Sequence, residues 1–443
     1  MQEITLSQML EAREKRADLQ KEFIRIYNCP LICFTMNIAG PIKHTSLIER
    51  AFKEGLSALD NTIPAVCIRE RRINIAPTGC EAFFAVAMDA KSIKEICIAI
   101  EDACPLGRLY DIDVLDVDAK KLERKTMRGC IVCSAPGRFC AAGRVHSVSD
   151  IQKATYNIIR EHFLEKDCKR IAELATKSLL QEVYTTPKPG LVDSRNNGSH
   201  TDMNISTFEK SANALTPYFY NCVAIGQRTK NAPYCETFAL LKNAGIIAEE
   251  QMYQATNNIN THKGAIYSIG VICGAIGRLW KPETPIAKTE EIFLMCAELV
   301  NDAVKEYFSS IDCSTNGGRL YIEHGIKGIR GEVATGFPSV LSIGLPAYQK
   351  ALESGLSSND AGVLTLLQFI ANIEDTNLYH RGGIDGAHYA ADYAKNILRN
   401  AEIPSLKSVE KMDDDFISKN LSPGGCADLL AVTYLLYELK NGL

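Results

Sequence analysis

The sequence has almost no charge imbalance and no apolar run of membrane-spanning length. Its 49 basic and 53 acidic residues leave a formal charge of only −4. No global field therefore predicts binding to nucleic acid or to an anionic membrane, although local basic clusters can still hold phosphates. The N-terminus lacks the apolar core of a signal peptide. The most apolar stretches, such as residues 265–277, are too short to cross a bilayer.

Sixteen cysteines occur in the chain. Without a signal peptide, this number is more typical of reduced thiols in the cytoplasm than of a disulfide framework. The hydrophobic fraction of 46% and the charged fraction of 23% are ordinary for a soluble protein. A chain of 443 residues is too long for one core, so we expect two or three domains in a cytoplasmic protein.

The first part of the chain mixes helical and extended patterns, which predicts an α/β or α+β domain. Periodicity and turn residues predict helices over 5–27 and 92–102, and strands over 31–43 (broken at Gly40-Pro41), 83–88 and 109–118. The charged segment 150–173 is predicted to be helical and contains no Gly/Ser linker. We place the domain boundary between residues 163 and 170, which gives domains of 1–165 and 166–443.

Strand patterns nearly vanish after this boundary, which predicts an all-α second domain. Apolar residues recur at helical spacing over 171–179, 265–280, 363–373 and 429–439. Asn260 is expected to cap the second of these helices.

Two aspartates in the last predicted strand suggest metal chemistry. Alternate residues of a strand share a face, so Asp111 and Asp113 should project together, opposite Ile112 and Val114. Mg²⁺ prefers oxygen ligands and is often shared between carboxylates and substrate phosphates. Arg108, in the preceding Pro-Leu-Gly-Arg turn, has a guanidinium suited to phosphate. The alternative is an ordinary strand edge with solvated aspartates.

A cysteine-rich tail follows this strand. Cys130 and Cys133 form a Cys-x2-Cys pair, and Cys140 and His146 follow within thirteen residues. These four residues could provide a tetrahedral Zn²⁺ site with three thiolate ligands and one imidazole. Unconnected thiols are the alternative in so cysteine-rich a chain.

The segments NIAGPIKHT (37–45) and PLGRLYDIDV (105–114), with the Cys/His tail, resemble the CitX family, apo-citrate lyase phosphoribosyl-dephospho-CoA transferase. The resemblance covers about residues 1–160 and implies a nucleotidyltransferase-like domain. Such an enzyme attaches a CoA-derived group to a serine of the citrate lyase acyl carrier protein, the gamma subunit, and releases diphosphate. It also implies substrate-binding roles for Asn37 and Lys43. The Gly-Ser pair usual before the paired acids of nucleotidyltransferases is absent here.

Five polar, glycine-containing segments punctuate the second part; four are predicted to be loops, and the fifth, 260–270, places His262 and Lys263 at the start of a helix. The longest, TTPKPGLVDSRNNGSHTDM (185–203), has prolines and glycines that end the preceding helix. The others are 260–270, 324–339, 374–383 and 422–431, the last of which contains Asp428 behind a Gly-Gly pair. Each alone is most simply a turn, but five such segments could converge on a polyphosphate and its metal ion.

The motifs TTPKPGLVD, NNGSHTDM, NTHKGA, KGIRGE and EDTNLYHRGG, in this order, resemble the CitG family, triphosphoribosyl-dephospho-CoA synthase, over residues 168–443. That family joins the ATP ribose to 3′-dephospho-CoA and expels adenine. The resemblance implies ATP and 3′-dephospho-CoA as substrates and Mg²⁺ as cofactor. We expect the general base and metal ligands among Asp193, Asp202, Glu332, Glu374 and Asp375. We expect substrate contacts from Lys188, Arg195, His200, His262, Lys263, Lys327, Arg330 and Arg381.

Fusion of both families in one chain favours sequential chemistry, because the product of the second domain is the donor used by the first. Two alternatives stay open at this point. One is the equivalent enzyme pair for malonate decarboxylase, and the other is a non-catalytic assembly factor of the lyase.

Overall fold

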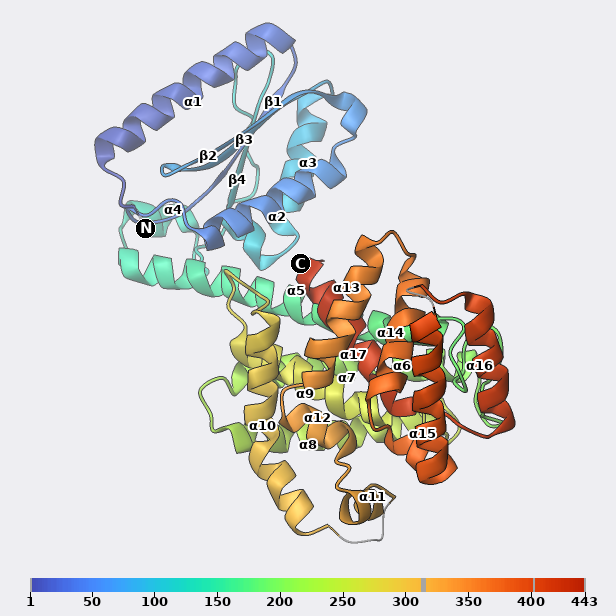
Figure 1. Ribbon diagram of the computed structural model, residues 1–443. Helices are drawn as coiled ribbons and strands as arrows, with labels where there is room; N and C mark the ends of the chain where they lie inside the picture. The colour runs from blue at the N-terminus through green and yellow to red at the C-terminus, as the bar shows by residue number, and fades with distance from the viewer. Residues whose placement is uncertain (1, 312–315, 401–402, 442–443) are drawn as a thin grey trace. The chain divides into compact units, whose positions relative to one another are not determined.

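The chain folds into two compact units. The computed structural model describes residues 2–311, 316–400 and 403–441. Unit 1 comprises Met1–Lys166 and unit 2 comprises Asp167–Leu443, and their boundary falls inside the long helix α5, Val148–Tyr184 (Figure 1).

Unit 1 is built on a four-stranded sheet in the order β2-β3-β1-β4. Every neighbouring pair is antiparallel, so of the two predicted classes the unit is α+β. The strands are β1 Leu31–Met36, β2 Ile68–Ala76, β3 Gly79–Val86 and β4 Tyr110–Leu115. The other elements before α5 are α1 Leu6–Tyr27, α2 Ser46–Thr62, η1 Ala65–Cys67, α3 Ala90–Asp102, η2 Pro105–Leu109 and α4 Gly137–Ala142.

Helices cover both faces of this sheet. On one face, Phe23 of α1 packs in a buried cluster with Cys33 and Phe83. On the other face, Phe34 of β1 stacks on Phe52 of α2 with ring centroids 4.8 Å apart. Figure 1 shows α1 on one side of the strands and α2 and α3 on the other.

The predicted elements of unit 1 exist, but their bounds differ. The strand predicted over 31–43 ends at Met36, because the chain there turns into the Asn37–Lys43 loop. The sequence patterns also missed α2 and β2. Most β2 residues are exposed, so this edge strand lacks a continuous apolar signal.

Unit 2 is helical, as predicted. Its core is α9, Lys263–Leu279, which is buried on nearly every side and contacts α7, α8, α10 and α17. The helices after α5 are α6 Ile205–Ala214, α7 Thr216–Arg228, α8 Tyr234–Ala255, α9, α10 Thr289–Ser309, α11 Asn316–His324, α12 Gly328–Ala334, the π-helix η3 Val340–Gly344, α13 Leu345–Glu353, α14 Ser358–Asn372, α15 Thr376–Asn400, α16 Leu406–Ser418 and α17 Gly424–Asn441.

Three of the predicted loops are largely helical. Residues 328–334 form α12, residues 376–383 lie in α15, and residues 424–431 begin α17. Packing against neighbouring helices overrides the low helix propensity of their glycines. The predicted cap was also wrong, because α9 begins after His262 rather than after Asn260.

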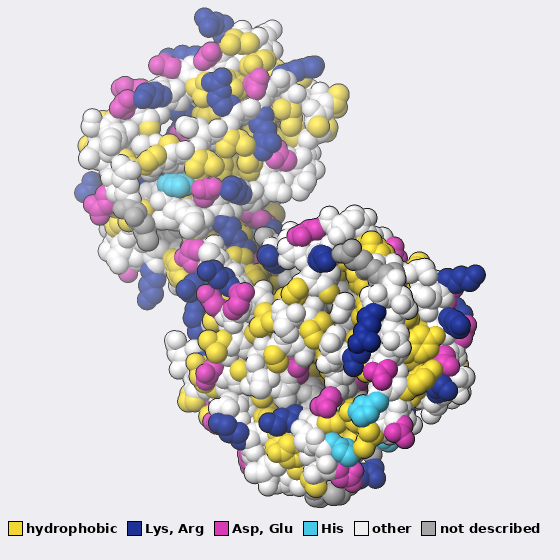
Figure 2. Space-filling model, in the orientation of Figure 1, with side chains coloured by type: hydrophobic (Ala, Val, Ile, Leu, Met, Phe, Trp, Pro, Cys, Tyr) yellow, Lys and Arg dark blue, Asp and Glu magenta, His cyan; other side chains and the backbone are white. Residues whose placement is uncertain are grey.

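Charged side chains of both signs are interspersed over the visible face of each unit (Figure 2), in keeping with the small net charge. Over the part of the chain that the structure describes, no helix combines the length and apolarity that crossing a membrane requires.

Candidate active sites

One end of the sheet in unit 1 brings together the residues that sequence analysis singled out. Asp111 lies opposite Thr35 in the β1–β4 register. At the same end, the Asn37 amide donates to the Leu109 carbonyl over 2.8 Å, which joins the loop after β1 to η2. Lys43 Nζ donates to the Ile38 carbonyl, so this lysine lies against the same loop. The two segments of the predicted phosphate site are therefore adjacent.

Asp111 and Asp113 share one face of β4, as predicted, while Ile112 and Val114 are buried on the other. Loss of solvation and the charge of Asp113 raise the pKa of Asp111. The negative charges of Asp111 and Asp113 repel each other, and a cation bound between them would reduce this repulsion.

Arg108 does not point freely into this site. Its guanidinium donates to the Gly129 carbonyl, and Arg128 donates to the carbonyls of Tyr110 and Gly107. These contacts attach the segment after β4 to the start of the strand.

Two groups in this region escaped the sequence analysis. Lys121 Nζ lies 2.6 Å from Asp113 Oδ1 and provides a local counter-charge. Arg16 of α1 forms an ion pair with Glu81, which lies in the cross-strand row of Thr35 and Asp111. Both pairs join residues that are not neighbours in sequence, so no local pattern identifies them.

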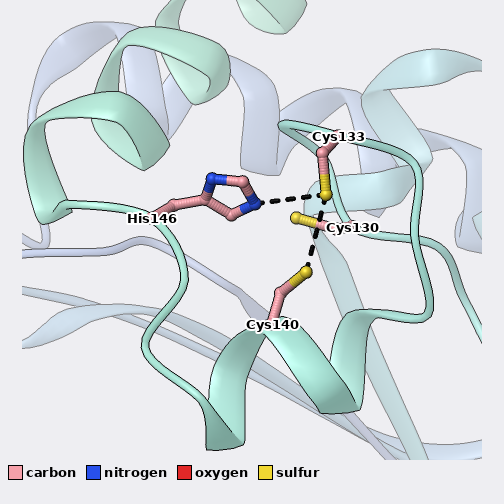
Figure 3. Close-up of side chains that lie close together, drawn as sticks. All are labelled: Cys130, Cys133, Cys140 and His146. Atoms are coloured by element: carbon pink, nitrogen blue, oxygen red, sulfur yellow. Dashed lines mark hydrogen bonds between the residues drawn. The ribbon is translucent and has the colours of Figure 1, made fainter.

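The four predicted zinc ligands do converge. Figure 3 shows the Cys130, Cys133, Cys140 and His146 side chains pointing toward one another, and their ligand atoms all lie within 4.8 Å of each other.

In unit 2, the loop after α5 is held by buried ionic groups. Lys188 is 1% exposed, and its Nζ donates to Glu182 Oε1 over 2.5 Å and to the Glu182 carbonyl over 2.7 Å. Asp193 accepts hydrogen bonds from the backbone amides of Lys188, Arg195 and Asn196. Both oxygens of Asp193 are thereby committed to shaping the loop.

A second buried aspartate, absent from the predicted site, fixes the other side of this loop. Asp413 of α16 accepts from the Gly190 amide over 2.9 Å, from Arg195 over 2.5 Å and from the Asn196 amide group over 2.7 Å. Gly190 has φ +70°, and a Cβ there would lie 2.1 Å from the Leu421 carbonyl oxygen. Only glycine fits this close approach.

Three carboxyl groups surrounded by protein, Glu182, Asp375 and Asp428, form what we call the acid cluster. Asp375 accepts from the amides of Asn377 and Leu378 at the start of α15, and from the Cys426 amide at the start of α17. Asp428 makes no hydrogen bond or ion pair to any residue that the structure describes. Burial, followed by the charges of Glu182 and Asp375, raises the pKa of Asp428 well above its ordinary range.

The acid cluster borders the first turn of α9. A Cβ placed on Gly264 would lie 1.9 Å from Asp428 Oδ2, so only a glycine allows the helix to approach this carboxyl. Asp428 nevertheless keeps partial solvent exposure. Asp428 is therefore surrounded by protein without being fully shielded from solvent.

Two predicted histidines have unusual environments. His262 is 3% exposed; its Nδ1 lies 2.7 Å from Ser211 Oγ, and its Nε2 has no partner among the described residues. Burial and the charge of Lys188 lower the pKa of His262 to about 3. Burial and Arg381, which donates to His200 Nδ1, lower the pKa of His200 to about 4. Both imidazoles are neutral at pH 7.

The other predicted residues of unit 2 are more peripheral. Asp202 and Glu374 are exposed, and Lys263 pairs with Glu249 over 2.8 Å. Glu332 accepts from the amide and hydroxyl of Ser339.

A cavity of about 370 Å³ opens beside the first turns of α9. Ile266 and Tyr267 line it close to Gly264 in sequence, and Arg330 lies over the Tyr307 ring, 4.4 Å from its centroid, at the same cavity. Ligand pockets of this size are typically lined by aromatic side chains with a few polar groups. Lys327 Nζ lies 5.9 Å from the ring centroid of Phe308, the residue that follows Tyr307 in sequence.

Both units correspond to families of transferases. Residues 4–162 match the CitX family model, described as apo-citrate lyase phosphoribosyl-dephospho-CoA transferase. Residues 168–443 match the CitG family model, described as ATP:dephospho-CoA triphosphoribosyl transferase. The chain therefore belongs to the CitX and CitG families, joined in this order in one polypeptide.

Two relatives that match nearly the whole chain, and a third that matches part of it, support this assignment. Protein CitXG of Haemophilus influenzae is 34% identical over 458 residues, covering 99% of this chain and 97% of that protein. Protein CitXG of Leuconostoc mesenteroides subsp. cremoris is 32% identical, covering 99% and 98%. A protein of Haemophilus ducreyi named 2-(5′′-triphosphoribosyl)-3′-dephosphocoenzyme-A synthase is 38% identical, covering 70% of this chain and 99% of its own length.

Proposed function

We propose that this chain makes and attaches the prosthetic group of citrate lyase. Unit 2 converts ATP and 3′-dephospho-CoA into 2′-(5′′-triphosphoribosyl)-3′-dephospho-CoA and adenine. Unit 1 transfers the phosphoribosyl-dephospho-CoA group to a serine of the citrate lyase acyl carrier protein, and diphosphate leaves. The observation that supports this most strongly is the match of both family models in one chain, because the product of one reaction is the donor of the other.

In unit 2, the breaking of the bond between adenine and ribose is assigned to the acid cluster and the cavity, both of which border the first turns of α9. The aromatic cavity beside Tyr267 and Tyr307 receives the flat adenine ring. Burial and the neighbouring carboxylates raise the pKa of Asp428, which favours its protonated form, and this carboxyl is assigned the role of proton donor to the departing base. A ribose hydroxyl of dephospho-CoA then forms the new bond to the ribose carbon and loses its own proton.

The remaining groups position these parts. Asp193 and Asp375 are positioning residues because backbone amides occupy their oxygens. Lys188 forms a buried ion pair with Glu182, whereas Arg195 and His200 hold the loop. The general base and the ligands of the nucleotide's Mg²⁺ come from Asp202, Glu332 and Glu374. The triphosphate is bound by the positively charged side chains of Lys263, Lys327, Arg330 and Arg381. His262 is neutral and provides an uncharged hydrogen-bonding group.

In unit 1, Asp111 and Asp113 are the residues that fit Mg²⁺, since they share a face and concentrate negative charge. The ion would neutralise the charge of the leaving diphosphate. Asn37 and Lys43 border the same end of the sheet and are assigned to orienting the phosphates, whereas Arg108, whose guanidinium donates to the Gly129 carbonyl, supports the segment beside them. The domain would thus work as a nucleotidyltransferase, in which a serine oxygen forms the new bond to phosphorus as the bond to diphosphate breaks.

The first reaction is tested by incubating the purified chain with ATP, dephospho-CoA and Mg²⁺ and following free adenine by chromatography. We expect adenine only when dephospho-CoA is present. A folded protein that forms no adenine would contradict the proposal and favour a binding role in lyase assembly. Labelling of the malonate decarboxylase carrier protein in preference to the citrate lyase carrier would contradict the assigned partner.

A further inference from the structure

The Cys/His tail of unit 1 forms a compact set of ligands that the proposed reactions do not use. Cys140 is placed by the short helix α4, and Cys133 Sγ lies 3.5 Å from Cys140 Sγ and 3.2 Å from His146 Nε2 (Figure 3). Cys130 completes the set, since all four ligand atoms lie within 4.8 Å of one another.

These separations match a metal site better than a disulfide. Zn²⁺ lies about 2.3 Å from sulfur and about 2.0–2.1 Å from imidazole nitrogen, so neighbouring ligand atoms of a tetrahedral site are roughly 3.5–3.8 Å apart. The observed 3.5 Å and 3.2 Å are close to these edges. A disulfide requires sulfur atoms about 2.05 Å apart, and it would leave the other thiol and the imidazole without a role.

The backbone around the Cys-x2-Cys pair has a suitable shape. The Val132 amide donates to Cys130 Sγ over 3.4 Å, and the Ser134 amide donates to the Cys130 carbonyl over 3.0 Å. Ser134 adopts φ +61°, which turns the chain sharply after Cys133. Amide donors to a ligating sulfur stabilise its thiolate form and orient it toward a metal.

This segment has little apolar core to hold it. Met127 is 60% exposed, Phe139 69% and Val145 63%, whereas Cys140 is buried. Hydrophobic burial therefore contributes little to its order, and small segments of this kind usually need a metal or disulfide as a substitute.

The segment is also attached to the candidate active site. Arg128, two residues before Cys130, donates to the Tyr110 carbonyl at the start of β4 over 2.8 Å and to the Gly107 carbonyl of η2. Arg108 reaches back to the Gly129 carbonyl. An ion bound between the four side chains would thus stabilise the segment that supports the strand of Asp111.

We propose that Cys130, Cys133, Cys140 and His146 bind one structural Zn²⁺ ion in a closed site of three thiolates and one imidazole. Four protein ligands leave no open position, so the ion has no catalytic water. Its function is to hold residues 128–146 against η2 and β4. The inference does not depend on the proposed reactions.

The test is metal analysis of the full chain, purified after growth with added zinc under reducing conditions, by inductively coupled plasma mass spectrometry. We expect about one zinc per chain in the parent and in the control Cys67→Ser, whose cysteine lies in unit 1 outside the cluster. Cys133→Ser and His146→Ala should fall to below about one tenth of this. His146→Cys should retain zinc, because four thiolates also form a stable zinc site.

A spectroscopic measurement covers the case in which a variant fails to fold. The parent chain, stripped with a chelator and refilled with Co²⁺, should show the visible bands of tetrahedral cobalt and the ultraviolet thiolate-to-cobalt bands. His146→Cys should shift these bands. A parent chain without zinc that also lacks these bands with Co²⁺ would overturn the proposal. So would retention of zinc by Cys133→Ser, or a native disulfide within the cluster detected by peptide mapping.

Discussion

Replacing Asp428 by asparagine tests the role of this carboxyl as proton donor to adenine. Asparagine has nearly the same shape but cannot supply the proton. A positioned general acid contributes roughly 10²–10⁴-fold to a rate, so kcat for adenine release should fall by about this factor. The assay is adenine formation from ATP and dephospho-CoA, measured under saturating substrate.

The same substitution should not weaken the fold. Burial and the neighbouring carboxylates raise the pKa of Asp428 above its ordinary 3.8. Above pH 3.8 the unfolded chain therefore releases a proton that the folded chain retains, and this contribution lowers stability as pH rises toward the raised pKa. Asparagine does not titrate, so Asp428→Asn should unfold at pH 7 at a temperature no lower than the parent.

The pH profile gives a further check. Because a general acid must be protonated, adenine release by the parent should decline as pH rises through the raised pKa of Asp428. The residual activity of Asp428→Asn should lack this decline.

Asp193→Asn is the matched control. Its oxygens accept three backbone amides, so it should lose roughly 1–3 kcal/mol of unfolding free energy. Unchanged adenine release by a folded Asp428→Asn would refute the reasoning.

Three other substitutions test separate parts of the account. Gly264→Ala places a methyl group 1.9 Å from Asp428 Oδ2. Adenine release should fall at least about tenfold, while the circular dichroism spectrum stays helical. Full activity would contradict the claim that a side chain at this position displaces Asp428. Asp111→Asn should lower carrier-protein labelling by about 10²-fold or more without changing adenine release, and the exposed Asp118→Asn should affect neither; equal loss in both variants would argue against the metal site. Asp413→Ala removes the acceptor of the buried Gly190 amide and of the Asn196 amide group, whereas the exposed Arg195 keeps its ion pair with Asp414. Thermal unfolding should therefore report a loss of roughly 1–3 kcal/mol; a loss no larger than that of Asp118→Asn would contradict this.

Local patterns predicted those features that depend on neighbouring residues. The period of a strand places Asp111 and Asp113 on one face whatever lies around them, and the structure confirms this. The close spacing of Cys130 to His146 likewise predicted their convergence. The mixed first unit and the helical second unit also follow from periodicity alone.

Long-range partners could not be read from the sequence. Asp413 accepts from the Gly190 amide across 223 residues of sequence, and Arg381 donates to the Ser199 carbonyl across 182 residues. The sequence places Asp428 beside a Gly-Gly pair, but its raised pKa arises only when α17 packs near Glu182 and Asp375. The glycines of α12 and α15 predicted loops because glycine has a low helix propensity. Packing against other helices stabilises these segments as helices, and a local pattern cannot predict that packing.

The most direct test of the account couples both units in one reaction. The purified chain is incubated with apo citrate lyase acyl carrier protein, ATP, dephospho-CoA and Mg²⁺, and the carrier's intact mass is measured. We predict a mass increase equal to one phosphoribosyl-dephospho-CoA group, which disappears when either ATP or dephospho-CoA is omitted and when Asp111→Asn replaces the parent. Adenine formation without any gain in carrier mass, by folded protein, would contradict the claim that one chain both makes and attaches the group.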